Sequence, residues 1–160
     1  MRTVQGDMVL RGEDDTLRLG QKLARSVYAG EKIYLHGDLG AGKTTLVRGF
    51  LQAMGHKGAV RSPTYSLVEH YFYKNLRVFH FDLYRLGDAS ELEYMGIRDY
   101  FFGNSVCLVE WADRGRGVLP AADIEVKLEY SGTASRRAHL ESHTAKGQSL
   151  LQKVLNSPGP

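Results

Sequence analysis

Eight consecutive residues, Gly37 to Thr44 (GDLGAGKT), match the phosphate-binding pattern G-x-x-x-x-G-K-[ST] in full. The apolar run Ile33 to Leu35 precedes them, and a helical pattern from Leu46 to Met54 follows. In such a strand–loop–helix unit, backbone N–H groups turn toward phosphate oxygens and the helix N-terminus directs positive charge at them. Lys43 would reach the β- and γ-phosphates, and the Thr44 hydroxyl would bind Mg²⁺. The motif therefore predicts a nucleoside triphosphate site.

Two acidic residues close apolar strands elsewhere in the chain. Asp82 ends the run Arg77 to Phe81, and Glu110 ends the run Val106 to Val109. A P-loop site needs a carboxylate at the end of a neighbouring strand, because Mg²⁺ takes oxygen ligands in octahedral geometry. One acid would hold the metal, directly or through water, and the other would orient or deprotonate the attacking water. The pattern does not decide which acid has which role.

The segment Ser62-Pro63-Thr64-Tyr65 lies between the P-loop helix and a predicted hairpin. GTPase-like folds place a loop that senses the γ-phosphate at this point. The other interpretation is a proline-fixed turn that leads into a strand. Trp111, the only tryptophan, follows Glu110 directly and either packs in the core or responds to the metal site. Our hypothesis is that this segment and Trp111 couple the nucleotide state to a protein partner.

Three further residues are predicted to be structural. His36 and His80 are interpreted as packing histidines, because no cysteine or second histidine stands at metal-ligand spacing. The single cysteine, Cys107, excludes an internal disulfide and is predicted to be a small core residue. A lone buried thiol suits a reducing cytoplasm.

Length and composition predict one soluble domain. A chain of 160 residues with 42% hydrophobic residues fits a single domain over residues 1–156, and the last four residues, Ser157-Pro158-Gly159-Pro160, are expected to be a loose tail. No apolar run approaches the roughly 20 residues of a membrane helix, and the N-terminus shows no signal-peptide core. We therefore expect a cytoplasmic protein without membrane contact. The net charge of +3 permits contact with nucleic acid, but the basic residues are scattered.

Hydrophobic periodicity predicts an α/β protein. The expected helices are Leu17 to Tyr28, Lys43 to Met54, Leu92 to Tyr100 behind a capping box at Asp88 and Glu91, and a closing helix around Leu150 to Leu155. The expected strands are Ile33 to Leu35, Tyr65 to Tyr73, Leu76 to Leu83, Val106 to Val109, Ile124 to Tyr130 and Ala138 to Glu141. Together they predict a P-loop NTPase fold, with a mostly parallel central sheet, flanking helices and an antiparallel hairpin portion.

The chain resembles the bacterial TsaE (YjeE) family of P-loop ATPases, which act in making the threonylcarbamoyl modification of adenosine 37 in tRNA. The resemblance extends from about Glu13 to about Leu140. Its motifs are GDLGAGKT from Gly37, Arg48-Gly49-Phe50, SPTYSLVE from Ser62, HFDLYR from His80, ELEYMGIRDY from Glu91, and Val109-Glu110-Trp111. Ser66 stands where relatives usually have threonine, and Ala112-Asp113 stands where proline is frequent; neither departure touches the phosphate site.

The resemblance implies a set of site residues. Thr44 and Glu110 are the expected Mg²⁺ ligands, and Asp82 is an essential acid near the metal and the attacking water. Lys43, Asp82 and Glu110 form the expected catalytic group. The expected nucleotide-binding residues are Glu13, Asp38, Leu39, Gly40, Ala41, Gly42, Lys43, Thr44, Thr45 and Arg136.

The resemblance also implies ATP, ADP and Mg²⁺ as ligands and the TsaD and TsaB proteins as partners. Hydrolysis would be slow in the free protein, which we expect to be a monomer, and tRNA would be met only through the complex. The main rival is a small-molecule kinase, which shares the P-loop but commonly adds an arginine-bearing helical lid, whereas the residues after Glu110 are glycine-rich. A GTP-dependent switch is disfavoured because no N-K-x-D motif is present, and an RNA-binding module is disfavoured because arginines and aromatics do not cluster.

Overall fold

The computed structural model describes residues 3–157, which contain both strands and helices. The strands are β1 (Gln5–Arg11), β2 (Lys32–His36), β3 (Val68–Tyr73), β4 (Leu76–Asp82), β5 (Val106–Glu110), β6 (Ile124–Tyr130) and β7 (Ser135–Ser142). The helices are α1 (Gly12–Ser26), α2 (Lys43–Ala53), α3 (Ser90–Tyr94), α4 (Ile97–Phe101), α5 (Ala145–Asn156) and the short 3-10 helix η1 (Ala112–Gly115). The predicted tail lies outside the described residues apart from Ser157.

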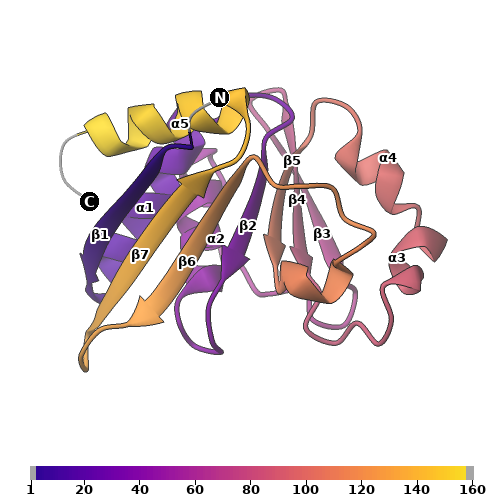
Figure 1. Cartoon of the computed structure of the whole chain (residues 1–160), viewed down its shortest axis with the longest axis horizontal. Helices are drawn as coiled ribbons and strands as arrows, with labels where there is room; N and C mark the ends of the chain where they lie inside the picture. Colours follow the sequence, from indigo (N-terminus) through magenta and orange to yellow (C-terminus); the bar gives the residue numbers. More distant parts are fainter. Residues whose placement is uncertain (1–2, 158–160) are drawn as a thin grey trace.

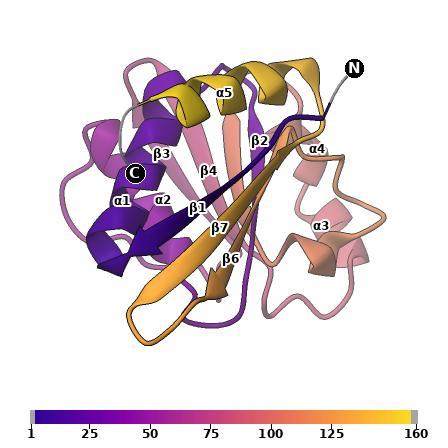
Figure 2. The same ribbon diagram turned by 60° about the vertical axis from the view of Figure 1, so that its left-hand side comes forward.

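All seven strands form one sheet in the order β1-β7-β6-β2-β5-β4-β3 (Figure 1). The central strands β6, β2, β5 and β4 run parallel to one another. Both edges are antiparallel, since β3 pairs with β4 on one side and β7 lies between β6 and β1 on the other (Figure 2). The predicted mostly parallel sheet with an antiparallel portion is confirmed.

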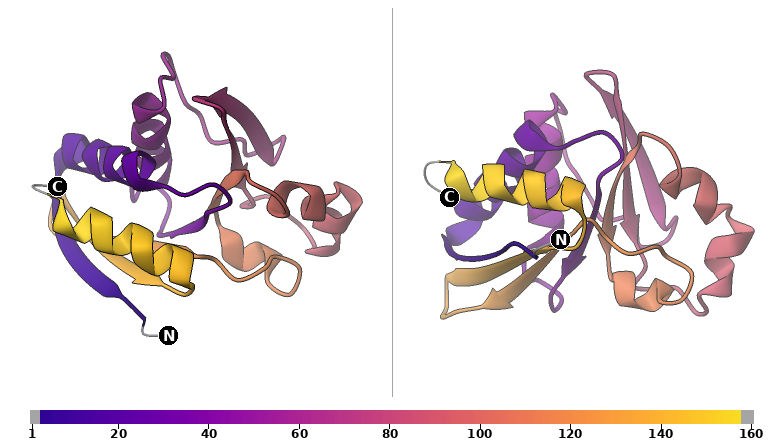
Figure 3. Two further views of the ribbon diagram at one scale, coloured as in Figure 1. Left: turned by 90° about the horizontal axis from the view of Figure 1, so that it is seen from above. Right: turned by 45° about the horizontal axis from the view of Figure 1, so that its top comes forward.

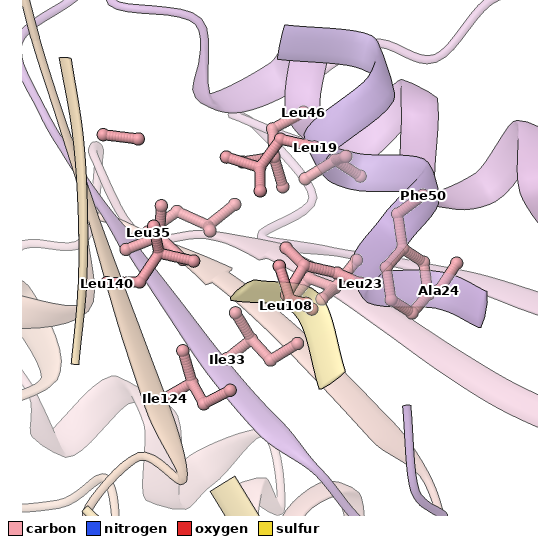
Figure 4. Packing of buried hydrophobic residues seen from close by; sticks show 14 of the residues in the cluster. Leu19, Leu23, Ala24, Ile33, Leu35, Leu46, Phe50, Leu108, Ile124 and Leu140 are labelled. Carbon is pink, nitrogen blue, oxygen red and sulfur yellow. The ribbon is translucent and has the colours of Figure 1, made fainter. Parts of the chain in front are cut away.

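The two faces of the sheet carry separate hydrophobic clusters. The larger cluster joins sheet residues such as Ile33 and Leu108 to apolar residues of α1 and α2 (Figure 4). Apolar residues of α5 belong to the same cluster. The smaller cluster includes Phe81 and Val109 and lies under α3, α4 and η1. Seen from above, these two groups of helices lie on opposite sides of the sheet (Figure 3). Successive side chains of a strand point to opposite faces of the sheet. The place of a residue along β4 or β5 therefore decides which of the two groups of helices its side chain contacts.

Helices α1 and α2 approach closely because each has a glycine that faces the backbone of the other helix. A Cβ atom on Gly20 would lie 2.0 Å from the carbonyl oxygen of Leu46, and one on Gly49 would lie 2.2 Å from that of Leu17. Any larger residue at these positions would push the helices apart. The close contact fixes the P-loop helix α2 against α1, whose N-terminal end borders the candidate site described below.

The predicted hairpin is present, with a later start. Lys74 and Asn75 form its turn with φ values of 52° and 61°, as a two-residue type I′ connection requires. The first strand begins at Val68, because the preceding residues form a tight turn in which Leu67 N–H donates to the Pro63 carbonyl at 2.8 Å. The prediction that this strand begins at Tyr65 is therefore wrong by three residues.

The helix predicted over Leu92 to Tyr100 is wrong as a single element. Gly96, with φ of 75°, separates α3 from α4. The predicted capping box is also absent in its reciprocal form: Asp88 Oδ1 accepts from the N–H of Ser90, the first residue of α3, at 2.9 Å. The Glu91 N–H, which a capping box would join to the Asp88 side chain, donates to the Asp88 backbone carbonyl at 3.0 Å.

Sequence periodicity missed the N-terminal strand β1 and the first turn of α1. The pairing partner of β1 is β7, about 130 residues away in the chain, so no local sequence pattern predicts this pairing. Helix α1 starts at Gly12 and ends at Ser26 instead of spanning Leu17 to Tyr28. Its first turn is acidic and polar, so the apolar stripe begins only in the second turn.

Within residues 3–157, no helix is both long enough and apolar enough to cross a membrane.

Candidate nucleotide and metal site

The candidate site lies where three parallel strands end. The P-loop follows the carboxyl end of β2, Asp82 is the last residue of β4, and Glu110 is the last residue of β5. Open α/β sheets bind ligands outside the carboxyl ends of their strands, because loops and helix N-termini converge there. The topology therefore brings the P-loop, Asp82 and Glu110, which come from three separate segments of the chain, to the same edge of the sheet.

The P-loop positions Lys43 at the start of α2. Gly42 precedes it with φ of 110°, a left-handed conformation that glycine adopts without steric cost. The Lys43 side chain is only 4% exposed, and its ammonium donates to the carbonyl of Gly37. Burial lowers the pKa of Lys43, and the carboxylates of Glu110 and Asp82 oppose that shift. The lysine thus lies inside the loop, on the side of the two acids.

Asp82 and Glu110 are paired directly across β4 and β5 and are both buried. They project from the sheet face that packs against α2, because Val78 and Leu108, an even number of residues earlier, belong to the larger cluster on that face. Thr44 Oγ1 lies 3.2 Å and 3.1 Å from the two carboxylate oxygens of Glu110. The hydroxyl and carboxylate expected to hold Mg²⁺ are therefore in direct contact.

Two residues of the predicted switch segment also reach the acids. Ser62 Oγ donates to Asp82 Oδ2 and lies 3.3 Å from Glu110 Oε2. Thr64 Oγ1 lies 3.4 Å from the same Asp82 oxygen, whose partner Oδ1 accepts the Tyr84 N–H at 2.9 Å. The segment is a turn, as one interpretation held, and its hydroxyls nevertheless face the carboxylates.

The other two residues of the segment lie elsewhere. Pro63 is buried, and its carbonyl accepts the N–H that closes the turn. Tyr65 is 85% exposed, with the Arg85 guanidinium 4.5 Å from its ring centroid. The structure therefore brings Ser62 and Thr64 to the site and leaves Tyr65 on the surface beside it.

Trp111 lies against the P-loop lysine. The Lys43 ammonium is 3.7 Å from the centroid of the indole, well within the range of a cation–π contact. Trp111 adopts a left-handed conformation with φ of 59°, and Tyr84 packs on it with the ring centroids 4.9 Å apart. A bulky residue in this conformation is strained and needs support from its surroundings.

Two adjoining cavities flank the P-loop and share Gly40, Gly42 and Thr45 in their walls. The first, of about 260 Å³, contains Lys43, both acids and Trp111 in its lining. The second, of about 360 Å³, is lined by the start of α1, the P-loop and the β6–β7 turn. The first has the groups to hold phosphates and a metal, and the second lies where a nucleoside would continue from them.

Glu13 and Arg136 both line the second cavity. Glu13 accepts from Arg48 of α2, which holds its carboxylate at the rim. Arg136 lies over the ring of Tyr130 at 4.1 Å, and the Tyr130 hydroxyl donates to the carbonyl of Leu39 at 3.2 Å. The late hairpin is thereby attached to the P-loop, which explains how a residue almost 100 positions away reaches it.

The remaining P-loop residues have distinct places. Leu39 is exposed and lines the first cavity, Ala41 is buried beneath the loop, and Thr45 lines both cavities. Asp38 contributes its carbonyl to a turn that the Ala41 N–H closes at 3.0 Å.

Sequence reasoning missed several residues of the site. Thr16, Thr133 and Ala134 line the second cavity, and Tyr84 lines the first. No motif marks Thr16, Thr133 and Ala134, since strand pairing and helix packing bring them there, and Tyr84 lies inside the HFDLYR motif without a predicted role. His80 was interpreted as a packing residue, yet its Nε2 lies 2.6 Å from Glu110 Oε2. The available signal was its place two residues before Asp82, which puts both side chains on one face of β4.

The donor set fits Mg²⁺ bound together with a nucleotide. Its members are a hydroxyl and two carboxylates, and hard cations of this kind prefer oxygen. Among the described residues, no group of three or more histidine, cysteine, aspartate or glutamate side chains is arranged to hold a metal by itself. Magnesium at phosphate sites usually takes only one or two carboxylates and completes its shell with phosphate and water. Thr44 and Glu110, with Asp82 beside them, match that pattern.

Comparison with known proteins identifies the family. A family model described as "Threonylcarbamoyl adenosine biosynthesis protein TsaE" matches residues 10–138. A Haemophilus influenzae protein named "tRNA threonylcarbamoyladenosine biosynthesis protein TsaE" is 50% identical over 149 residues, which cover 90% of this chain and 94% of the relative. A Bacillus subtilis protein of the same name is 36% identical over 77% of each chain. The crystal structure of Bacillus subtilis YdiB is similar with a TM-score of 0.83 and 26% identity over 97% of both chains. On these matches, the chain belongs to the TsaE family.

Proposed function

We propose that this chain binds ATP with Mg²⁺ and hydrolyses it in support of the TsaD–TsaB pair during threonylcarbamoylation of adenosine 37 of tRNA. The observation that carries the ATPase proposal is the convergence of Thr44, Asp82 and Glu110 beside the P-loop lysine. Family membership supports the pathway, because the curated relatives are named for threonylcarbamoyladenosine biosynthesis.

The chain's own groups divide the work as follows. Backbone N–H groups of the P-loop and the Lys43 ammonium bind the phosphates. Thr44 and Glu110 would hold Mg²⁺, which when bound neutralises charge on the phosphate oxygens. Asp82, with one oxygen fixed by the Tyr84 N–H, orients the attacking water and accepts its proton. The second cavity holds the nucleoside between Glu13 and Arg136.

The loop from Ser62 to Thr64 connects the chemistry to the partner in this proposal. Its hydroxyls contact Asp82. A γ-phosphate would compete for the same hydroxyls, so the loop would differ between the ATP and ADP states. Hydrolysis would then reset the TsaD–TsaB complex between turnovers.

The proposal is tested by measuring phosphate release from ATP for the protein alone, with small-molecule acceptors, and with TsaD and TsaB. We expect slow release alone, acceleration by TsaD and TsaB together, and no phosphorylated acceptor. Threonylcarbamoylated tRNA formed by the complete system should depend on the intact P-loop. Transfer of the phosphoryl group to a small acceptor, with no response to TsaD and TsaB, would overturn the proposal in favour of a kinase.

A further inference from the structure

His80 is a fully buried histidine whose ring makes one hydrogen bond within residues 3–157, to the carboxylate of Glu110. It lies on β4 directly opposite Leu108 of β5, two residue pairs before the pairing of Asp82 with Glu110. Its side chain is 0% exposed, and its Nε2 lies 2.6 Å from Glu110 Oε2. The short distance is typical of a hydrogen bond to a charged acceptor.

The other ring nitrogen is left without a partner. Nδ1 of His80 is buried, and no hydrogen-bond partner for it exists in residues 3–157. The carboxylate oxygen accepts this hydrogen bond, so Nε2 is the ring nitrogen that carries the proton and donates it. In the neutral ring, Nδ1 is then an acceptor without a partner. An apolar side chain would fill the same space without burying such an atom. Packing alone therefore gives no reason for a histidine at this position.

The other hydrogen bonds to the Glu110 carboxylate come from groups that nucleotide binding would engage. Thr44 is the expected metal ligand, and Ser62 belongs to the loop that would meet the γ-phosphate. His80 differs from Thr44 and Ser62 because it belongs to a strand inside the sheet and not to the P-loop helix or the loop at Ser62. Carboxylates that ligate metals are commonly oriented by such supporting hydrogen bonds.

We propose that His80 is a positioning residue that holds Glu110 Oε2 and thereby keeps the carboxylate, whose two oxygens lie 3.2 Å and 3.1 Å from Thr44 Oγ1, oriented toward the metal. This inference rests on the proposed function, because it needs a magnesium-dependent nucleotide site. Its consequence is specific: His80 should matter for the magnesium-dependent part of nucleotide binding and not for the part made by the P-loop backbone.

The test compares His80→Phe, which keeps a ring and removes the donor, with His80→Gln, whose amide can still donate near the Nε2 position. The measurements are the Mg²⁺ concentration for half-maximal tightening of ATP binding, the ADP affinity in EDTA, and thermal melting. We expect His80→Phe to raise the Mg²⁺ concentration about tenfold or more, with ADP affinity in EDTA within twofold of wild type. In His80→Gln this Mg²⁺ concentration should be closer to that of wild type. The melting temperature of His80→Phe should not be lower than that of wild type.

His143→Phe is the matched control, because His143 makes a similar contact, 2.7 Å from Glu125, outside the site. It should leave the magnesium dependence unchanged. Unchanged magnesium dependence in His80→Phe, or an equal loss of ADP affinity in EDTA, would overturn the role of His80 and leave the proposed function standing. A wild-type protein whose ATP binding does not respond to Mg²⁺ would overturn both.

Discussion

Lys43 lies over the indole of Trp111, with its ammonium 3.7 Å from the ring centroid. The same ammonium donates to the Gly37 carbonyl of its own loop. Both contacts occupy the group that a P-loop uses to hold β- and γ-phosphates. Nucleotide binding should therefore move the lysine from the indole to the phosphates, which links the occupancy of the site to the surroundings of the only tryptophan.

Tryptophan fluorescence should report this movement. Adding ATP with Mg²⁺ to the wild-type protein should change the emission of Trp111, because a cation leaves the face of its ring. In Lys43→Ala the emission of the free protein should already differ from wild type, and saturating nucleotide should produce little further change. An identical nucleotide response in Lys43→Ala and wild type would contradict the exchange of contacts.

Loss of the Lys43 ammonium should weaken nucleotide binding on the order of tenfold or more, since a hydrogen bond to a charged group contributes roughly 1.5 to 3 kcal/mol. Calorimetric titration of Lys43→Ala with ATP measures the effect. Lys127→Ala is the control, because Lys127 is an exposed strand residue paired with Glu129. Wild-type affinity in Lys43→Ala would remove the lysine from the binding site.

Asp82→Asn and Glu110→Gln should abolish most ATP hydrolysis in the presence of TsaD and TsaB. Both changes nearly preserve volume, so the melting temperature should stay near that of wild type. Glu125→Gln is a suitable control, since Glu125 also accepts from histidines but lies outside the two cavities. If either variant hydrolyses ATP at the normal rate, that residue has no part in the chemistry.

Thr64→Ala should remove the difference in TsaD–TsaB affinity between the ATP and ADP states. The Thr64 hydroxyl lies 3.4 Å from Asp82 Oδ2, at the wall of the phosphate cavity, so it can distinguish the two nucleotides. ADP binding itself should persist, because the P-loop is intact. Equal partner affinity of the wild-type protein in its ATP, ADP and empty states would refute the coupling.

Glu31 should make stability depend on pH at the opposite end of β2 from the P-loop. Its carboxylate oxygens are buried without a hydrogen-bond partner in the described part of the chain, and burial, assisted by Asp123, raises its pKa from 4.5 to about 7. The folded state therefore holds a proton that the unfolded state releases, so stability is fully present below pH 4.5 and falls as the pH rises toward 7.

Glu31→Gln should remove this loss and stabilise the protein above pH 7 by on the order of 1 to 3 kcal/mol relative to wild type. Urea unfolding at several pH values measures the difference. Glu129→Gln changes an exposed residue, so its free energy of unfolding should depend on pH in the same way as that of wild type over this range. A Glu31→Gln curve that also runs parallel to wild type would contradict the raised pKa.

The sequence alone was sufficient for the features that depend on neighbouring residues. The P-loop, the helix from Lys43 and the Lys74-Asn75 turn are local, because each follows from conformational preferences within a few positions. Asp82 and Glu110 could be selected because each closes an apolar strand, and alternation then fixes the face on which each side chain lies.

Only the tertiary structure decided what depends on distant pairing. The pairing of β1 with β7 and the parallel register of β4 with β5 join segments that share no local signal. That register brings His80 to Glu110 and gathers Thr44, Ser62 and the two acids within contact distance. A one-residue shift in the pairing of β4 would turn His80 and Asp82 to the other face of the sheet, so long-range strand packing, rather than any motif, completes the site.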